Sequence, residues 1–201
     1  ETVLILFRKI KTNEKYTLKC GGKKMVEKIR TLIPREDIEK RIAEIAAQIE
    51  KDYEGKEIHL ISVLKGGVMF TVDLARAIKK NTVYLHFMSV SSYGNGTESS
   101  GNIKINMDLD ESIKDKTVII AEDIIDSGRT LSILKKMLLE RQPESLKICT
   151  LLDKPDRRVA EVEVDYTCFK VPDEFVVGCG LDYAQKYRNL DYVGIISFEE
   201  E

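Results

Sequence analysis

Three carboxylates in the middle of the chain offer the clearest chemistry in the sequence. Residues 118–120 are β-branched and carry no polar side chain, which predicts a short buried strand. Glu122 and Asp123 come at the end of this run, and Asp126 follows a few residues later. Carboxylates gathered at the end of a buried strand are costly unless cations, hydroxyls or phosphates satisfy them. We therefore expect a ligand site at this point of the chain.

The residues that follow predict a phosphate-binding turn. A turn of mostly small residues is formed by Asp126, Ser127, Gly128, Arg129 and Thr130. Gly128 can adopt a positive φ angle, and the apolar spacing of residues 131–139 predicts a helix directly after the turn. Unpaired N–H groups and the positive end of the helix dipole point at such a turn, so it can bind a phosphate.

A strand followed by acids is also the Walker B pattern of P-loop nucleotidases, which need a G-x-x-x-x-G-K-[ST] loop upstream. The chain contains no such loop, and its glycine pairs at residues 21–22 and 66–67 do not fit one. Residues 118–131 instead resemble the signature with which phosphoribosyltransferases bind phosphoribosyl pyrophosphate (PRPP). The EDIIDSG sequence within them is that of the hypoxanthine-guanine branch, and the resemblance covers roughly residues 33–198.

The composition agrees with a folded enzyme domain. A chain of 201 residues is long enough for one domain with a sizeable core, and an apolar fraction of 43% excludes disorder. The net charge of −2 gives no reason to expect a nucleic-acid partner, and no apolar run approaches the length of a membrane span. We therefore expect small-molecule partners, with neither nucleic acid nor membrane among them.

The cysteines and histidines predict structural roles. No C-x-x-C motif is formed by the four cysteines, which are Cys20, Cys149, Cys168 and Cys179. They are interpreted as reduced core thiols of a cytoplasmic protein. The only two histidines, His59 and His86, lie in strand-like alternations, which argues against a Ser-His-Asp or histidine-rich metal mechanism.

The order of predicted elements indicates an α/β fold. A helix begins near Pro34, and residues 58–64, 68–80 and 82–90 predict a strand, a helix and a second strand. This βαβ order implies a parallel twisted sheet flanked by helices, with a ligand crevice at the carboxyl ends of the strands. Two further strands are predicted at residues 146–152 and 162–169.

The resemblance adds a small hood subdomain over the base to this fold. Residues 31–201 are expected to form the phosphoribosyltransferase domain, with the hood built from its N-terminal part and about residues 165–201. Residues 1–30 are an N-terminal extension without an assigned role; within it, residues 3–7 could form a strand, and residues 9–28 are rich in lysine and predict a solvated surface or linker.

The resemblance also implies roles on the PRPP side of the site. Glu122 and Asp123 would hold the ribose hydroxyls directly or through Mg²⁺, and Asp182 would be a second magnesium carboxylate. Residues 126–130 would bind the 5-phosphate, and Asp126 could also act as the general base on the purine. The pyrophosphate would bind to the backbone of Lys65 and Gly66, where a cis Leu64–Lys65 bond is expected, and to Arg188.

On the base side, the resemblance implies that Lys154 donates to the 6-oxo group of the purine, which would separate 6-oxopurines from adenine. Phe175 would stack on the ring, the backbone of Val176 would bind its edge, and Asp182 also belongs to the purine-binding set. Residues 91–101 resemble a mobile lid, in which Ser92 and Tyr93 close over the reaction centre to exclude water.

The implied activity is purine salvage, in which PRPP and hypoxanthine or guanine give IMP or GMP and pyrophosphate. Two alternatives remain at this point, a PRPP-sensing regulator of the same fold and a transferase that prefers xanthine. The family resemblance suggests a homodimer or homotetramer. The sequence departs from the family pattern at Ala121, Arg129 and Cys179, which affects packing and the phosphate loop.

Overall fold

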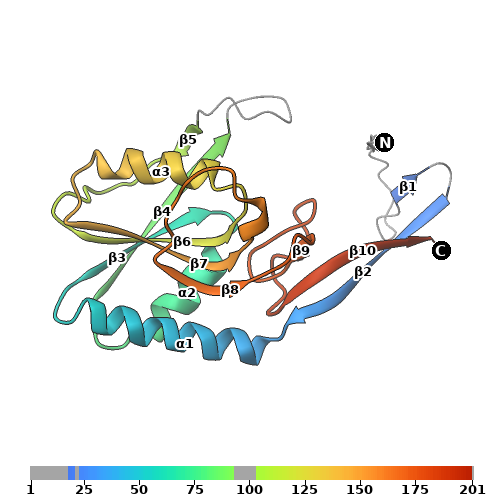
Figure 1. Ribbon diagram of the computed structural model, residues 1–201, viewed down its shortest axis with the longest axis horizontal. Helices are drawn as coiled ribbons and strands as arrows, with labels where there is room; N and C mark the ends of the chain where they lie inside the picture. Colours follow the sequence, from blue (N-terminus) through green and yellow to red (C-terminus); the bar gives the residue numbers. More distant parts are fainter. Residues whose placement is uncertain (1–17, 21–22, 93–102, 201) are drawn as a thin grey trace.

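A central sheet of mostly parallel strands positions the acidic segment. The computed structural model describes residues 18–20, 23–92 and 103–200. In these residues, a six-stranded sheet has the order β5-β4-β3-β6-β7-β8 (Figure 1). Its strands are β3 (Ile58–Leu64), β4 (Val83–Ser92), β5 (Ile103–Met107), β6 (Thr117–Ile125), β7 (Ser145–Asp153) and β8 (Tyr166–Lys170). All neighbouring strands are parallel except β4 and β5, which form an antiparallel hairpin at one edge. The predicted α/β fold is confirmed.

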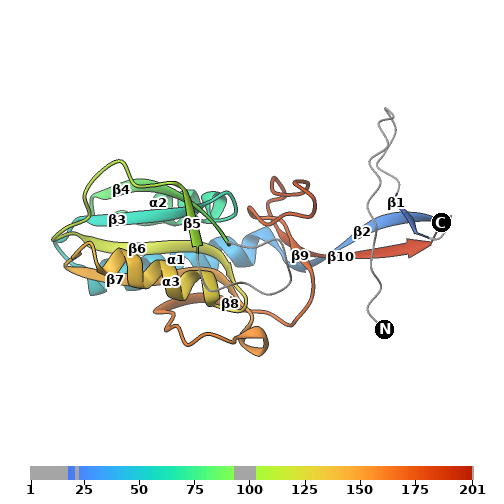
Figure 2. The same ribbon diagram turned by 90° about the horizontal axis from the view of Figure 1, so that it is seen from above.

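Helices cover both faces of this sheet (Figure 2). Helices α1 (Arg35–Asp52) and α2 (Val68–Ala77) pack on one face, and α3 (Arg129–Leu139) packs on the other. The apolar stripe of α1 is buried, as its spacing predicts. Helix α2 ends at Ala77, three residues before the predicted end, because Glu50 of α1 accepts the backbone N–H groups of Lys79 and Lys80.

Strand β6 is longer than the apolar run predicts, and this changes the position of the acids. The strand continues to Ile125, and Glu122 pairs with Thr150 of β7. The expectation that the two adjacent acids follow the strand is therefore wrong, since both lie within it. Side chains alternate between the faces of a strand, so Glu122 and Asp123 leave β6 on opposite sides.

The strand predicted at residues 162–169 also has different bounds, since β8 begins only at Tyr166. The preceding residue, Asp165, accepts hydrogen bonds from the Lys147 side chain at 2.6 Å and the Ile148 backbone at 2.8 Å. Val162 and Val164 pack instead against the apolar cluster under α3. The alternation of these valines therefore reflects packing on a helix.

A second sheet lies beside the first and forms the hood. Within the described residues its order is β1-β2-β10-β9, and all pairs are antiparallel. Its strands are β1 (Leu18–Cys20), β2 (Lys23–Ile33), β9 (Val176–Val177) and β10 (Val193–Glu200). Figure 2 shows β2 and β10 as a ribbon that extends away from the central sheet.

Residues 23–28 belong to β2, so they are not a linker, whereas the exposed side chains of Val26 and Lys28 agree with the predicted solvated surface. Pairing of Lys23 and Lys24 with β1, and of residues 25–28 with β10, holds this lysine-rich segment in a strand despite its composition. Residues 3–7 lie outside the described part of the chain. Strand β2 crosses residue 30, and the division into an extension and a domain at that point remains a prediction.

The side chains outside the site agree with structural roles. Cys149, Cys168 and Cys179 are buried free thiols. His59 and His86 are buried on neighbouring strands, with 2.9 Å between His59 Nδ1 and His86 Nε2. A helix long and apolar enough to cross a membrane does not occur in the described residues.

Candidate active site

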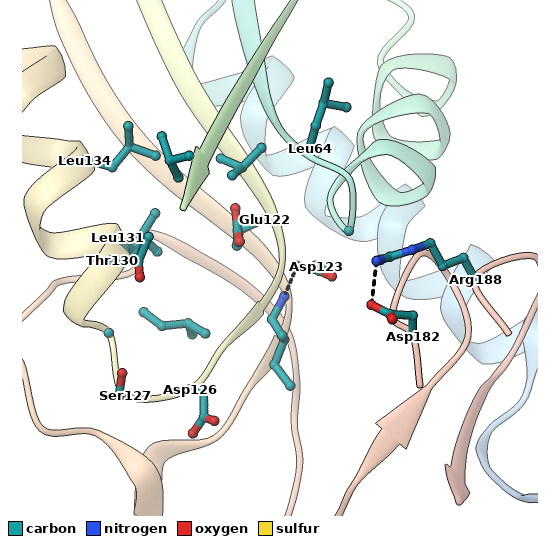
Figure 3. Close-up of a pocket in the computed structure, with 16 residues that line it drawn as sticks. Leu64, Glu122, Asp123, Asp126, Ser127, Thr130, Leu131, Leu134, Asp182 and Arg188 are labelled. Carbon is teal, nitrogen blue, oxygen red and sulfur yellow. Dashed lines mark hydrogen bonds and ion pairs between the residues drawn. The ribbon is translucent and has the colours of Figure 1, made fainter. Parts of the chain in front are cut away.

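A cavity opens at the carboxyl ends of β3 and β6, where the fold predicts a ligand crevice (Figure 3). Its volume is about 360 Å³, and its polar side chains are Glu122, Asp123, Asp126, Ser127, Thr130, Asp182 and Arg188. A second cavity of about 460 Å³ shares Asp123, Asp126 and Asp182 with the first. The structure thus brings predicted site residues from three separate parts of the chain together.

The turn between β6 and α3 forms one end of the first cavity. Gly128 has a φ angle of 75°, in the left-handed region expected for it, and a Cβ there would lie 2.9 Å from Arg158 Cδ. Ser127 and Thr130 line the cavity together with Gly128. Arg129 begins α3 with an exposed side chain and is not among the lining residues. The helix dipole of α3 points its positive end at this turn, as a phosphate requires.

Glu122 and Asp123 lie in the interior of the site, and neither forms an ion pair with another described residue, although the charge of Arg188 acts on Asp123. Asp123 is only 8% exposed, and one oxygen accepts the Ile124 N–H at 3.0 Å. Glu122 Oε2 is buried without a hydrogen-bond partner in the described part of the chain. Burial raises the pKa of Asp123 to about 6, and burial together with the charge of Asp123 raises the pKa of Glu122. The pair is therefore suited to bind a cation or hydroxyl groups.

The loop after β3 passes close to the Asp123 side chain. The Leu64–Lys65 bond is cis, as the resemblance implies. A Cβ on Gly66 would lie 1.9 Å from Asp123 Oδ2, so only glycine leaves room for this carboxylate. Gly66 lines the first cavity, whereas the Lys65 ammonium donates to Gln185 Oε1 at 3.3 Å.

A loop from the hood closes the cavity opposite β6. Arg188 and Asp182 form an ion pair, with 2.5 Å between Nη2 and Oδ1 (Figure 3). Arg188 Nη1 also donates to the Gly180 carbonyl at 2.7 Å, while its Nε is buried without a hydrogen-bond partner among the described residues. In those residues, no group of three or more acidic, histidine or cysteine side chains could hold a metal by itself. The shared metal role of Glu122, Asp123 and Asp182 thus remains a prediction.

The second cavity contains the residues predicted to bind a base. Lys154 follows β7, is only 8% exposed and donates to the Glu174 carbonyl at 2.6 Å. Phe175 is 55% exposed and lines the cavity, and Val176 is buried in β9. The second cavity is therefore lined by Lys154, Phe175 and Asp126, as expected if a purine base binds there.

Arg157 is a site residue that the sequence analysis missed. Its Nε donates to Asp126 Oδ1 at 3.0 Å, and its Nη1 donates to Asp173 Oδ2 at 3.4 Å. It belongs to a 3₁₀ turn, η1 (Pro155–Arg157), that folds back from β7 toward β6. The signal was Pro155, since proline at the start of a helical turn reverses the chain directly after Lys154.

Ser92 is the last residue of β4, and Tyr93 lies outside the described residues, as do residues 94–101 of the predicted lid. The roles of both residues remain predictions. Of the three departures from the family pattern, Ala121 and Cys179 are buried in the core cluster beneath α1 and α2.

The fold and the site define a phosphoribosyltransferase. Residues 32–184 match the family model described as "Phosphoribosyl transferase domain", so the chain belongs to this family. A hypoxanthine-guanine phosphoribosyltransferase of Streptococcus thermophilus is 49% identical over 170 residues, which cover 85% of this chain and 94% of that protein. A hypoxanthine phosphoribosyltransferase of Salmonella typhimurium is 48% identical over 88% of this chain and 100% of its own.

Solved structures agree with this assignment. The crystal structure of a hypoxanthine-guanine phosphoribosyltransferase from Bacillus anthracis, with HEPES in its active site, matches with a TM-score of 0.80 and 46% identity. The match covers 86% of this chain and 99% of that one.

Proposed function

We propose that this protein is a purine salvage enzyme that transfers the 5-phosphoribosyl group of PRPP to N9 of hypoxanthine or guanine. The products are IMP or GMP and pyrophosphate. The observation that carries the proposal is the position of the buried pair Glu122 and Asp123 between a phosphate-binding turn and a cavity lined by Lys154. The names of the relatives support the choice of purine.

On the PRPP side, the turn from Asp126 to Thr130 binds the 5-phosphate through its N–H groups and the dipole of α3. Glu122 and Asp123 bind the ribose hydroxyls, which supply the partners that the Glu122 carboxylate lacks. Arg188 and the backbone of residues 65–66 bind the pyrophosphate as its negative charge increases. The buried Arg188 Nε supports this role, because it is a donor without a partner in the described residues.

On the base side, Lys154 donates to the 6-oxo group, Phe175 stacks on the purine, and the backbone of Val176 binds its edge. Lys154 already donates to the Glu174 carbonyl, so its ammonium is held at the cavity wall. Asp126 accepts the N7 proton as N9 attacks C1 of the ribose. This role is supported by its position in both cavities.

Mg²⁺ fits the residues of the site. Its ligands are oxygen atoms, usually one or two carboxylates together with substrate phosphates, and Glu122, Asp123 and Asp182 offer such carboxylates. When bound, the ion neutralises negative charge on the polyphosphate. Because the side chains would provide only part of a coordination shell, oxygens of PRPP would supply the remaining ligands.

The cellular setting is also proposed. A cytoplasmic location is supported by three buried cysteines that remain free thiols. A homodimer or homotetramer is supported by Leu85 and Phe87, apolar residues on one face of β4 that are more than a third exposed. Light scattering of the purified protein measures the oligomer directly.

An ultraviolet assay with PRPP and Mg²⁺ tests the activity, with hypoxanthine, guanine, xanthine and adenine supplied separately. Turnover of hypoxanthine or guanine, abolished by a chelator and restored by Mg²⁺, is expected. Xanthine shares the 6-oxo group, so the assay also decides whether it is a substrate. Absence of turnover with every base would overturn the proposal, and PRPP binding without turnover would favour a PRPP-sensing regulator.

A further inference from the structure

The hood loop that carries Asp182 and Arg188 has an unusual backbone. Ala184, Gln185 and Tyr187 have φ angles of 50°, 67° and 75°, in the left-handed region that residues other than glycine rarely adopt. Such conformations persist only where surrounding contacts hold them. Within the loop, the Gln185 N–H donates to Asp182 Oδ2 at 2.7 Å, so a change in the backbone also moves this carboxylate.

Two side-chain contacts to the loop come from β2, in the part of the chain that precedes the family match. The carboxylate of Glu27 accepts a hydrogen bond from the hydroxyl of Tyr187 and from the ammonium of Lys186, which lies 2.6 Å from Oε2. The Glu27 side chain is only 11% exposed. Burial and the hydrogen bond to Glu27 raise the pKa of Tyr187 to about 12, so its hydroxyl stays protonated as a donor.

The other strand of the ribbon supports the same loop. Phe198 of β10 contacts Tyr183 with 5.2 Å between ring centroids, and Tyr183 meets Phe175 edge-on at 5.7 Å. The Lys186 ammonium lies over the Tyr183 ring, 5.5 Å from its centroid. The ribbon of β2 and β10 thus contacts both the loop and, through Tyr183, the residue proposed to stack on the purine.

We propose that Glu27 is a positioning residue that fixes the loop of residues 182–188, so that Asp182 and Arg188 meet PRPP in the correct geometry. The inference rests on the proposed function and assigns a role to a segment that precedes the family match. Glu27 acts through Lys186 and Tyr187 without touching the substrate itself.

Substitution of Glu27 tests this role against a matched control on the same ribbon. Glu199→Gln removes the same charge from a surface ion pair with Lys28, in which both side chains are more than half exposed. For Glu27→Gln, a rise of roughly tenfold in the KM for PRPP is expected, with a smaller change in the KM for hypoxanthine. Glu27→Ala, which removes both acceptor oxygens, shows a larger rise, and Glu199→Gln stays within about twofold of the wild type.

A second variant and a second measurement separate positioning from general stability. Tyr187→Phe removes one donor from the opposite end of the contact and also raises the KM for PRPP. Amide hydrogen exchange across residues 182–188 is faster in Glu27→Gln than in Glu199→Gln. If Glu27→Gln lowers the melting temperature yet matches Glu199→Gln in both KM and exchange, the positioning role is overturned.

The same experiment distinguishes failure of the inference from failure of the proposed function. Lack of turnover by the wild-type protein rejects the enzyme activity. Hydrogen exchange in the loop then still decides whether Glu27 holds it, because that readout needs no substrate.

Discussion

Replacement of Gly66 by alanine tests whether the loop of residues 65–66, proposed to bind pyrophosphate, must leave room for the Asp123 carboxylate. A Cβ at this position would lie 1.9 Å from Asp123 Oδ2 and 2.5 Å from Cγ, whereas ordinary contacts begin near 3.4 Å. The carboxylate must therefore move by roughly 1.5 Å, given those distances. Gly66 does not have a positive φ angle, so the alanine backbone itself is tolerated.

The size of the expected loss of activity follows from this displacement. Misplacing a group that holds the substrate by about 1 Å lowers the rate by about 10²-fold, which corresponds to about 2.7 kcal/mol of transition-state stabilisation. We expect kcat/KM for PRPP to fall by this factor in Gly66→Ala, while the melting temperature changes little. Steady-state kinetics with varied PRPP and thermal unfolding measure the two quantities.

A double-mutant cycle identifies the cause. In an Asp123→Ala background, the atoms that the new methyl group would strike are absent, so Gly66→Ala has little further effect. Gly55→Ala is the control, because a Cβ there meets nothing within 4 Å although its φ angle is +74°; it lowers stability and leaves kcat/KM unchanged. Wild-type kcat/KM in Gly66→Ala, or a full effect in the Asp123→Ala background, would refute the reasoning.

Three further predictions concern catalysis, specificity and stability. Asp126→Asn lowers kcat by about 10² to 10⁴ if this residue is the general base, and unchanged turnover in a steady-state assay rules out that role. Lys154→Ala raises the KM for hypoxanthine and weakens its preference over adenine, whereas the exposed Lys170→Ala does neither; equal base preference in the two variants argues that selectivity arises elsewhere. Burial and the nearby His86 lower the pKa of His59 in the folded protein. Below pH 6.5, His59 therefore binds a proton in the unfolded chain but not in the folded protein, so the free energy of unfolding decreases as the pH falls. Urea unfolding at pH 8 and pH 5 should show a greater loss in the wild type than in His59→Phe, and equal losses would contradict this account.

The sequence predicted the central sheet well because local patterns and βαβ topology agree there. The run at residues 58–64 matches β3 in both bounds, and the apolar spacing after Pro34 matches the buried side of α1. Most of the site is also predictable, because the phosphate turn and Lys154 each follow a strand end and the two adjacent acids lie near the end of β6. Arg157 was missed, since its role depends on a turn that directs it back to Asp126.

The hood was the least predictable part, for a physical reason. Strand β2 is stabilised by its pairing with β10, which lies more than 150 residues later in the sequence, and no local pattern encodes that partner. The same holds for the extension of β6 to Ile125, where the ladder to β7 keeps two carboxylates in a strand. Tertiary pairing overrode local composition in both cases.

The position of β2 has a practical consequence for how the domain is delimited. A chain trimmed to the residues that match the family model would begin at Leu32 and keep only the last two residues of this strand. Such a chain would retain the central sheet, the acidic pair and the phosphate turn, yet it would end at residue 184 and lose all of β10 and Arg188 together with most of β2. A boundary drawn by sequence similarity would therefore leave the buried apolar strand β9 without its partner β10, and such an exposed strand edge favours aggregation.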